Sequence, residues 1–143
     1  MPFVRIWVHL IWSTKNREKI INKNLKPKLL NHILENAKQK GIYIDQINCI
    51  ADHLHALISL DTSQSISKVA FLLKGESSHW VNENKISPVH FEWQDEYIAV
   101  SVSESQVDKV RMYIKNQETH HRKMSFKDEF DLFIKKYGMN VLG

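Results

Sequence analysis

A chain of 143 residues has the size of one domain and can bury about two-thirds of the surface of its unfolded form, so it needs neither a disulfide nor a structural metal to fold. The only cysteine, Cys49, excludes an internal disulfide. No window approaches the about 18 consecutive apolar residues of a membrane span, so we expect a cytoplasmic protein without a secretory signal. A formal net charge of +4 favours a polyanionic partner but does not identify one.

The first part of the sequence predicts a strand, a helix and a hairpin. Residues 4–13 are rich in Val, Ile and Trp, which favours a strand. Leucine, isoleucine and alanine recur with helical spacing from Leu25 onwards, and Gly41 is the glycine expected just after a helix ends. Two further apolar runs, residues 42–50 and 53–60, are separated by only two residues, so they predict a β-hairpin.

The second part predicts a helix, a loop, a strand and two more helices. Apolar residues follow the helical period from Ile66 to Val81, and residues 82–95 are expected to form a loop. Residues 97–102 form the next expected strand, which leads into the capping-box sequence of residues 103–106 and a third helix. A last short helix is expected at residues 125–138, where phenylalanines recur at helical spacing.

This order of elements, β-α-β-β-α-β followed by helices, indicates an α+β protein of the ferredoxin-like, split βαβ type. Such a fold has one antiparallel sheet with two helices on one face. The helix that contains Tyr113 can then cover the other face.

Two histidines in the second hairpin strand form the first candidate site. His53 and His55 are two residues apart, so in a strand they point to the same side, away from the apolar parity of Leu54, Ala56 and Ile58. Two imidazoles on one side can bind a single cation. An isolated pair of this kind is more often a surface or hydrogen-bonded pair, so the neighbouring motifs must decide.

The helix after residue 102 supplies a second candidate motif. Its apolar stripe is Val107, Val110 and Ile114, and at about 100° per residue Tyr113 and Gln117 lie together on a neighbouring polar face. The tyrosine offers a phenol nucleophile and the glutamine an amide oxygen ligand. With the histidine pair, these are the parts of a metal-assisted phosphodiester transferase.

These residues resemble the IS200-like transposases, the single-tyrosine members of the HUH superfamily of DNA-nicking enzymes. The likeness runs from Val4 to about Gly138, so we expect residues 1–143 to form one such domain. It rests on four motifs in order, which are Asp52-His-Leu-His55, Leu73-Lys-Gly-Glu-Ser-Ser78, Trp93 with the strand at residues 97–102, and Tyr113-Ile-Lys-Asn-Gln117. The resemblance implies that Tyr113 is the nucleophile and that His53, His55 and Gln117 are metal ligands.

The resemblance also implies the reaction and the partners. We expect a DNA transposase that cleaves and rejoins single-stranded DNA with hairpin-containing ends through a 5′-phosphotyrosine, and thereby mobilises an insertion sequence. It implies an obligate homodimer in which the tyrosine of one subunit completes the histidine site of the other. From the residues alone, whether Tyr113 acts within its own chain is open.

The ligand set favours a weakly bound Mg²⁺ or Mn²⁺. Two imidazoles and one amide oxygen fill about half of an octahedron and leave positions for phosphate oxygens and water. Because no carboxylate belongs to this set, the site should bind the ion weakly until a DNA phosphate contributes. Imidazole ligation would favour Mn²⁺ over Mg²⁺ in vitro.

Basic side chains near these motifs are the candidate phosphate contacts. We assign DNA binding to Lys15 and Arg17 after the first strand, to Lys74 in the middle helix and to Lys115 beside the tyrosine.

Two other classes of function remain open. A non-catalytic module of the same fold could bind single-stranded nucleic acid on its sheet, but it would show exposed aromatic residues on the central strands. A metal-dependent hydrolase would need a carboxylate base or ligand in the cluster. Asp52 is the only nearby candidate, and its place in a turn favours a structural role.

Overall fold

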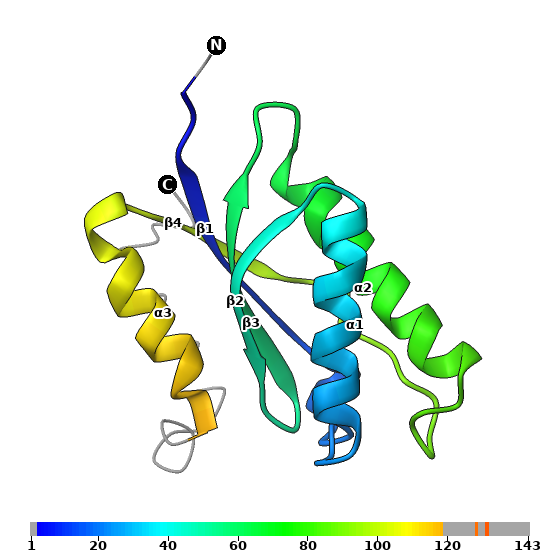
Figure 1. Ribbon diagram of the computed structural model, residues 1–143. Helices are drawn as coiled ribbons and strands as arrows, with labels where there is room; N and C mark the ends of the chain where they lie inside the picture. The colour runs from blue at the N-terminus through cyan, green and yellow to red at the C-terminus, as the bar shows by residue number, and fades with distance from the viewer. Residues whose placement is uncertain (1–2, 119–127, 129–130, 132–143) are drawn as a thin grey trace.

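A computed structural model describes residues 3–118, 128 and 131 of the chain. Within these described residues, four strands and three α-helices follow one another in the order expected from the sequence (Figure 1). They are β1 (Ile6–Ser13), α1 (Leu25–Gln39), β2 (Tyr43–Cys49), β3 (His53–Leu60), α2 (Ile66–Glu83), β4 (Ile98–Val102) and α3 (Val107–Lys115), with 3-10 turns at Lys15–Arg17 and Glu104–Gln106.

The strands form one antiparallel sheet in the order β2-β3-β1-β4. This is the ferredoxin-like arrangement, so the predicted fold class is confirmed. The central pair is in continuous register from Ile6 opposite Leu60 to Ser13 opposite His53. Both central strands are almost fully buried, whereas β2 and β4 are the edges of the sheet.

The larger core lies between the sheet and the helices α1 and α2, which cover one face together (Figure 1). Leu10 and Trp12 of β1 pack there with Leu29 and Ile33 of α1 and with Leu73 of α2. Alternation along β1 places these two residues on one face and Trp7 and His9 on the other, as strand geometry requires.

The opposite face of the sheet is covered by α3 (Figure 1). A smaller apolar cluster forms there from Trp7, Leu57, Val102, Val107, Val110 and Ile114. The apolar stripe predicted for this helix is therefore the surface that packs on the sheet, and Tyr113 lies beside it.

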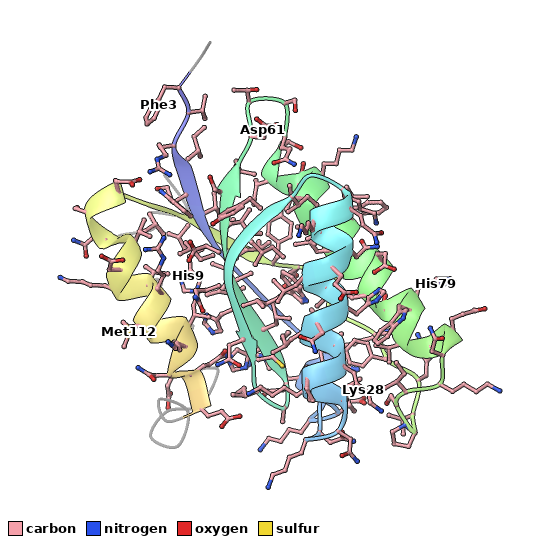
Figure 2. All side chains as sticks on the ribbon, viewed as in Figure 1. Phe3, His9, Lys28, Asp61, His79 and Met112 are labelled. Carbon is pink, nitrogen blue, oxygen red and sulfur yellow. The ribbon has the colours of Figure 1, made fainter. Side chains whose placement is uncertain are left out.

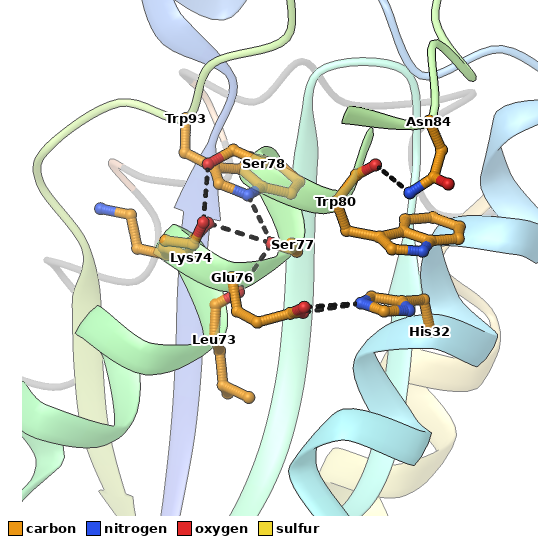
Figure 3. A network of polar contacts seen from close by, with 10 residues as sticks. His32, Leu73, Lys74, Glu76, Ser77, Ser78, Trp80, Asn84 and Trp93 are labelled. Carbon is orange, nitrogen blue, oxygen red and sulfur yellow. Dashed lines mark hydrogen bonds and ion pairs between the residues drawn. The ribbon is translucent and has the colours of Figure 1, made fainter. Parts of the chain in front are cut away.

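Side chains of α2 connect that helix to its neighbours (Figure 3). Ser65 accepts a hydrogen bond from the backbone N–H of Lys68, the contact expected of an N-terminal cap. On the buried side of α2, the indole N–H of Trp93 donates to the Ser77 hydroxyl at 2.8 Å, which links the helix to the segment before β4. On the side of α2 that faces α1, the ring of His32 stacks on that of Trp80 with ring centres 3.9 Å apart.

Three details differ from the expectation or lie beyond it. The helix α3 ends at Lys115 and Asn116 is a turn residue, so Tyr113 and Gln117 do not share one uninterrupted helix. Ser103 begins a 3-10 turn and makes no side-chain capping bond. The expected helix at residues 125–138 falls outside the described residues, apart from 128 and 131.

Candidate active site

The histidine pair begins β3 and is completely buried beneath the face that α3 covers. His53 and His55 are both 0% exposed, and their ring centres lie 5.3 Å apart. The Nδ1 of His53 lies 2.8 Å from Oδ1 of Asp52. Because a carboxylate can only accept, this nitrogen is the donor, and Nε2 is the ring atom with a lone pair for a ligand when the ring is neutral.

A third histidine of this site has no counterpart among the sequence motifs. His9 of β1 is 1% exposed, and its Nε2 lies 2.8 Å from Nδ1 of His55 (Figure 2). A single histidine within a strand forms no pair with the spacing typical of metal ligands, so the sequence alone does not single it out. The strand register that places it beside His55 is the information that the motifs lacked.

Tyr113 comes from α3 and lies against two of the three histidines. Its ring centre is 5.6 Å from that of His55 and 6.1 Å from that of His9, both with edge-on geometry. The tyrosine is half-buried. The structure therefore brings the predicted nucleophile and the predicted histidine pair together within one chain.

Gln117 is buried without hydrogen bonds. It is 0% exposed, and within residues 3–118, 128 and 131 neither its amide nitrogen nor its amide oxygen has a hydrogen-bond partner. Burying an unsatisfied amide costs free energy, so such a group is expected where a ligand completes its contacts. The helical break at Asn116 separates it from Tyr113.

Two polar contacts hold α3 on the sheet. The guanidinium of Arg111 donates to both carboxylate oxygens of Asp45, at 2.7 and 2.8 Å. Asp45 occupies a bulge in β2, where the pairing with β3 shifts register. The side-chain amide of Asn48 donates to the last carbonyls of the helix, at Ile114 and Lys115. The tyrosine helix is thus tied to the strand that neighbours the histidines.

The four predicted DNA-binding residues separate into different places. Lys15 and Lys74 line one cavity of about 520 Å³, whose other walls include Phe71, Trp93 and Tyr97. Lys115 is exposed at the end of α3, and Arg17 is exposed in the turn after β1, where its φ of 54° is left-handed.

Lys74 makes its closest contacts inside the protein. Its ammonium donates to the backbone carbonyls of Asp95 at 2.7 Å and Glu96 at 3.4 Å, and it lies 5.9 Å from the centre of the Tyr97 ring. Burial lowers the pKa of this amine, while the nearby carboxylates act in the opposite direction. Lys15, by contrast, is exposed and pairs with Glu92 at 3.0 Å.

The site offers nitrogen and amide donors to a metal rather than carboxylates. Among the described residues, no group of three or more His, Cys, Asp or Glu side chains is arranged to hold an ion. The buried histidine pair and the unsatisfied amide of Gln117 are side chains of types that can coordinate a divalent ion.

Within the same described part, no helix is long and apolar enough to cross a membrane.

Comparison with known proteins identifies the family. The model of the family described as "Transposase IS200 like" matches residues 3–117, which is most of the chain. The chain therefore belongs to the IS200-like transposases, a family of DNA-processing enzymes. Among curated proteins, the ISDra2 transposase TnpA of Deinococcus radiodurans is 26% identical over 115 residues, which cover 76% of this chain and 81% of that protein.

Two solved structures share the fold. One is a crystal structure from Deinococcus radiodurans R1 assigned as a transposase, with a TM-score of 0.65 and 24% identity, over 81% of this chain and 93% of that one. The other is a REP-associated tyrosine transposase bound to a REP hairpin, with a TM-score of 0.63 and 13% identity, over 85% of this chain and 72% of that one. At these identities the likeness is one of fold.

Proposed function

We propose that this transposase cleaves and rejoins single-stranded DNA through a 5′-phosphotyrosine at Tyr113, with a divalent metal ion held by His53, His55 and Gln117. The observation that carries the proposal is the position of the Tyr113 ring, 5.6 Å from that of His55, although the two residues come from different elements on the buried second face. A phenol beside a buried histidine, with the unsatisfied amide of Gln117 just beyond the end of the same helix, fits phosphodiester chemistry better than packing alone.

In the proposed reaction, the Tyr113 oxygen attacks a backbone phosphorus and loses its proton. The phosphorus–O3′ bond breaks, and the released 3′ oxygen takes up a proton. The products are a 5′-phosphotyrosine and a free 3′-hydroxyl. Attack by another 3′-hydroxyl on the same phosphorus then restores the phenol and joins two strands without ATP, because the phosphodiester energy is kept in the tyrosine link.

Mg²⁺ or Mn²⁺ is the cofactor that these donors suit, and when bound it would neutralise charge on the reacting phosphate. The hydrogen bond from Nδ1 of His53 to Asp52 leaves Nε2 as the coordinating atom of that ring. The burial of both histidines excludes bulk water from this side of the site.

Single-stranded DNA is the proposed substrate, since a duplex would hide the reacting phosphate. The cavity beside Lys15 supports this choice, because its walls combine a cation with the exposed rings of Phe71 (75% exposed) and Tyr97 (37% exposed). Exposed aromatic rings stack on unpaired bases. The structural neighbour bound to a REP hairpin makes hairpin-containing ends the first substrates to test.

The binding-module alternative has less support. That module would present bases with an open sheet face, but α1 and α2 cover one face here and α3 covers the other (Figure 1).

The proposal is tested with labelled single-stranded hairpin DNA and Mn²⁺. The wild-type protein should give a protein–DNA adduct that survives denaturation and disappears with chelator. Tyr113→Phe should give none while it still binds the DNA. Tyr97→Phe, the matched loss of a hydroxyl on the other side of the sheet, should keep the adduct. An adduct formed by Tyr113→Phe would place the nucleophile elsewhere.

A further inference from the structure

A buried histidine on the central strand β1 requires an explanation. His9 is 1% exposed and lies on the face that α3 covers (Figure 2). Its neighbours in register are Leu57 on β3 and Val100 on β4, both apolar. Burial of an imidazole among such residues is unfavourable unless a ring nitrogen forms a hydrogen bond.

That hydrogen bond joins His9 to a predicted metal ligand. In the β1–β3 pair, Leu57 is opposite His9 and His55 is opposite Ile11, so the two histidines are diagonal neighbours on one face. Diagonal side chains are within reach when they are long or aromatic. Here the ring centres are 5.0 Å apart, and the nitrogens Nε2 of His9 and Nδ1 of His55 are 2.8 Å apart.

We propose that His9 is a positioning residue of the metal site: its Nε2 accepts a hydrogen bond from the Nδ1–H of His55 and thereby presents the Nε2 of His55 to the ion. This inference rests on the function proposed above. A hydrogen bond between two imidazole nitrogens contains one proton, which sits on one of the two. A ring that coordinates through Nε2 has its proton on Nδ1, so His55 donates and His9 accepts.

The other histidine of the pair has the same arrangement with a different partner. Nδ1 of His53 donates to Asp52 at 2.8 Å, and Nδ1 of His55 lies at the same distance from His9. In both rings a neighbouring side chain thus contacts Nδ1. Asp52 and His9 come from different segments, and together they assign the same coordinating atom, Nε2, to both ligands.

Substitutions of His9 separate this role from packing. His9→Phe keeps an aromatic ring of similar size beside His55 and Tyr113 but removes the acceptor. His9→Gln places an amide oxygen near the position of Nε2 and can still accept. We would measure Mn²⁺ affinity without DNA by following free Mn²⁺ in electron paramagnetic resonance, and thermal unfolding in the same samples.

The expected result is a selective loss that the conservative variant reverses. His9→Phe should weaken Mn²⁺ binding by about 10- to 100-fold, the usual effect of losing a residue that orients a ligand, and His9→Gln should restore most of it. Trp7→Phe is the matched control, because Trp7 lies on the same strand and face but contacts Glu104 rather than His55. It should change stability and leave Mn²⁺ affinity unchanged.

The outcomes distinguish this inference from the proposed function. If the wild-type protein binds no Mn²⁺, the metal site itself is wrong. If the wild type binds Mn²⁺ and His9→Phe binds it equally well, the positioning role is overturned while the metal site stands. A direct measurement needs no variant. Side-chain ¹⁵N shifts of the Mg²⁺-saturated wild type should show His55 protonated at Nδ1, and protonation at Nε2 instead would overturn the proposal.

Discussion

Among the single residues of the site, Gln117 combines complete burial with an amide that makes no hydrogen bond within the described part of the chain. Unsatisfied buried groups lower stability by about 1–3 kcal/mol. A metal ion that the amide coordinates would offset this cost only when it is bound. At Gln117 we therefore expect that a change which raises the stability of the metal-free protein lowers its affinity for the metal.

Gln117→Met, a change to an apolar side chain of similar length, tests that opposition. We expect thermal unfolding to move upward by a few degrees, roughly 2–4 °C per kcal/mol for a domain of this size, because the desolvation cost is removed. Adduct formation with Mn²⁺ should fall by about 10-fold and not vanish, since water can replace one amide oxygen. Gln106→Met, at an exposed position before α3, is the control and should change neither property. A destabilised Gln117→Met with unchanged cleavage would assign the glutamine a structural role.

Cys49 illustrates a buried residue without a catalytic role. It is 0% exposed in the larger core, and burial raises the pKa of its thiol from 9.0 to about 12. The folded protein should therefore resist iodoacetamide at pH 8 and react fully in urea. Since the folded pKa is raised, the thiol's contribution to stability is present below pH 9 and is lost as the pH rises towards 12. The free energy of unfolding in urea should decline less over that pH range for Cys49→Ala than for the wild type. Equal declines in the two proteins would contradict a raised thiol pKa.

Residue types and spacing were enough to predict the histidine pair, Tyr113 and Gln117 as candidates, since each belongs to a motif with a fixed period. His9 could not be found this way. Its role depends on which residue of β3 lies diagonally opposite, and a register between strands that are far apart in sequence is not encoded in any local pattern. The internal use of Lys74 was missed for a similar reason, because its partners are backbone carbonyls of a loop.

At the scale of elements, α3 decides whether the tyrosine meets the histidines. Its apolar stripe accounts for the face it packs on, but its position along the sheet is set by polar contacts with β2. The Asp45 side chain is 8% exposed and forms two hydrogen bonds with Arg111, whose own side chain is 38% exposed. A second carboxylate, Asp108, also contacts Arg111 but is 91% exposed.

The two carboxylates make a matched comparison. Asp45→Asn should lower the free energy of unfolding by about 1.5–3 kcal/mol, the range for hydrogen bonds to charged groups. Asp108→Asn should change it by about 0–1 kcal/mol, as for an exposed ion pair. Because a loosened α3 withdraws Tyr113, only Asp45→Asn should also slow adduct formation. Denaturant unfolding measures the change in stability, and single-turnover cleavage measures the rate of adduct formation. Equal small effects of the two variants would show that the Asp45–Arg111 contact does not hold α3 in place.

The helices and strands were predicted close to their observed bounds because amphipathic periods and the alternation of strands are local properties. The bulge at Asp45 and the break at Asn116 were not, and both affect the site. The bulge provides the carboxylate for Arg111, and the break separates Gln117 from the helix of Tyr113. Each depends on how α3 meets β2, which is a tertiary contact.

On the scale of the whole molecule, the order of elements was sufficient to predict the ferredoxin-like sheet and the face left for α3. The same fold brings Lys15 and Lys74, far apart in sequence, to one cavity, where they differ in what they can do. Lys15 is exposed, whereas Lys74 is 9% exposed and bound to carbonyls.

DNA affinity measured against salt should separate these two lysines. Lys15→Ala should reduce the slope of log affinity against log salt by about 1, the value for one lost phosphate contact, without changing the melting temperature. Lys74→Met should lower the melting temperature, because it leaves the carbonyls of Asp95 and Glu96 without their donor. Lys38→Ala, an equal loss of charge on the exposed side of α1, should leave the slope unchanged. A reduced slope for Lys74→Met with no thermal effect would make that lysine a phosphate contact.

The oligomeric state is a property of the whole molecule, and for this protein it stays a prediction. We expect a homodimer, because β2 is an edge strand of the sheet that the described residues form, and its residues are mostly half-buried rather than charged and exposed. The predicted aromatic stripe of Phe126, Phe130 and Phe133 belongs to the same expectation but lies outside the described residues. Light scattering at micromolar concentration measures the mass, and a monomer there would remove the dimer.

Mixing two inactive variants then shows how the dimer uses its tyrosines. Tyr113→Phe lacks the nucleophile and His53→Ala lacks a ligand, so a mixed dimer contains one complete site only if α3 acts on the partner subunit. We expect the mixture to stay inactive, because Arg111 and Asn48 bind α3 to β2 of its own chain and Tyr113 lies beside its own His55. Subunit exchange must be proven with differently tagged chains. Adduct formation in the exchanged mixture would show instead that the helix crosses to the partner, as the family resemblance implied.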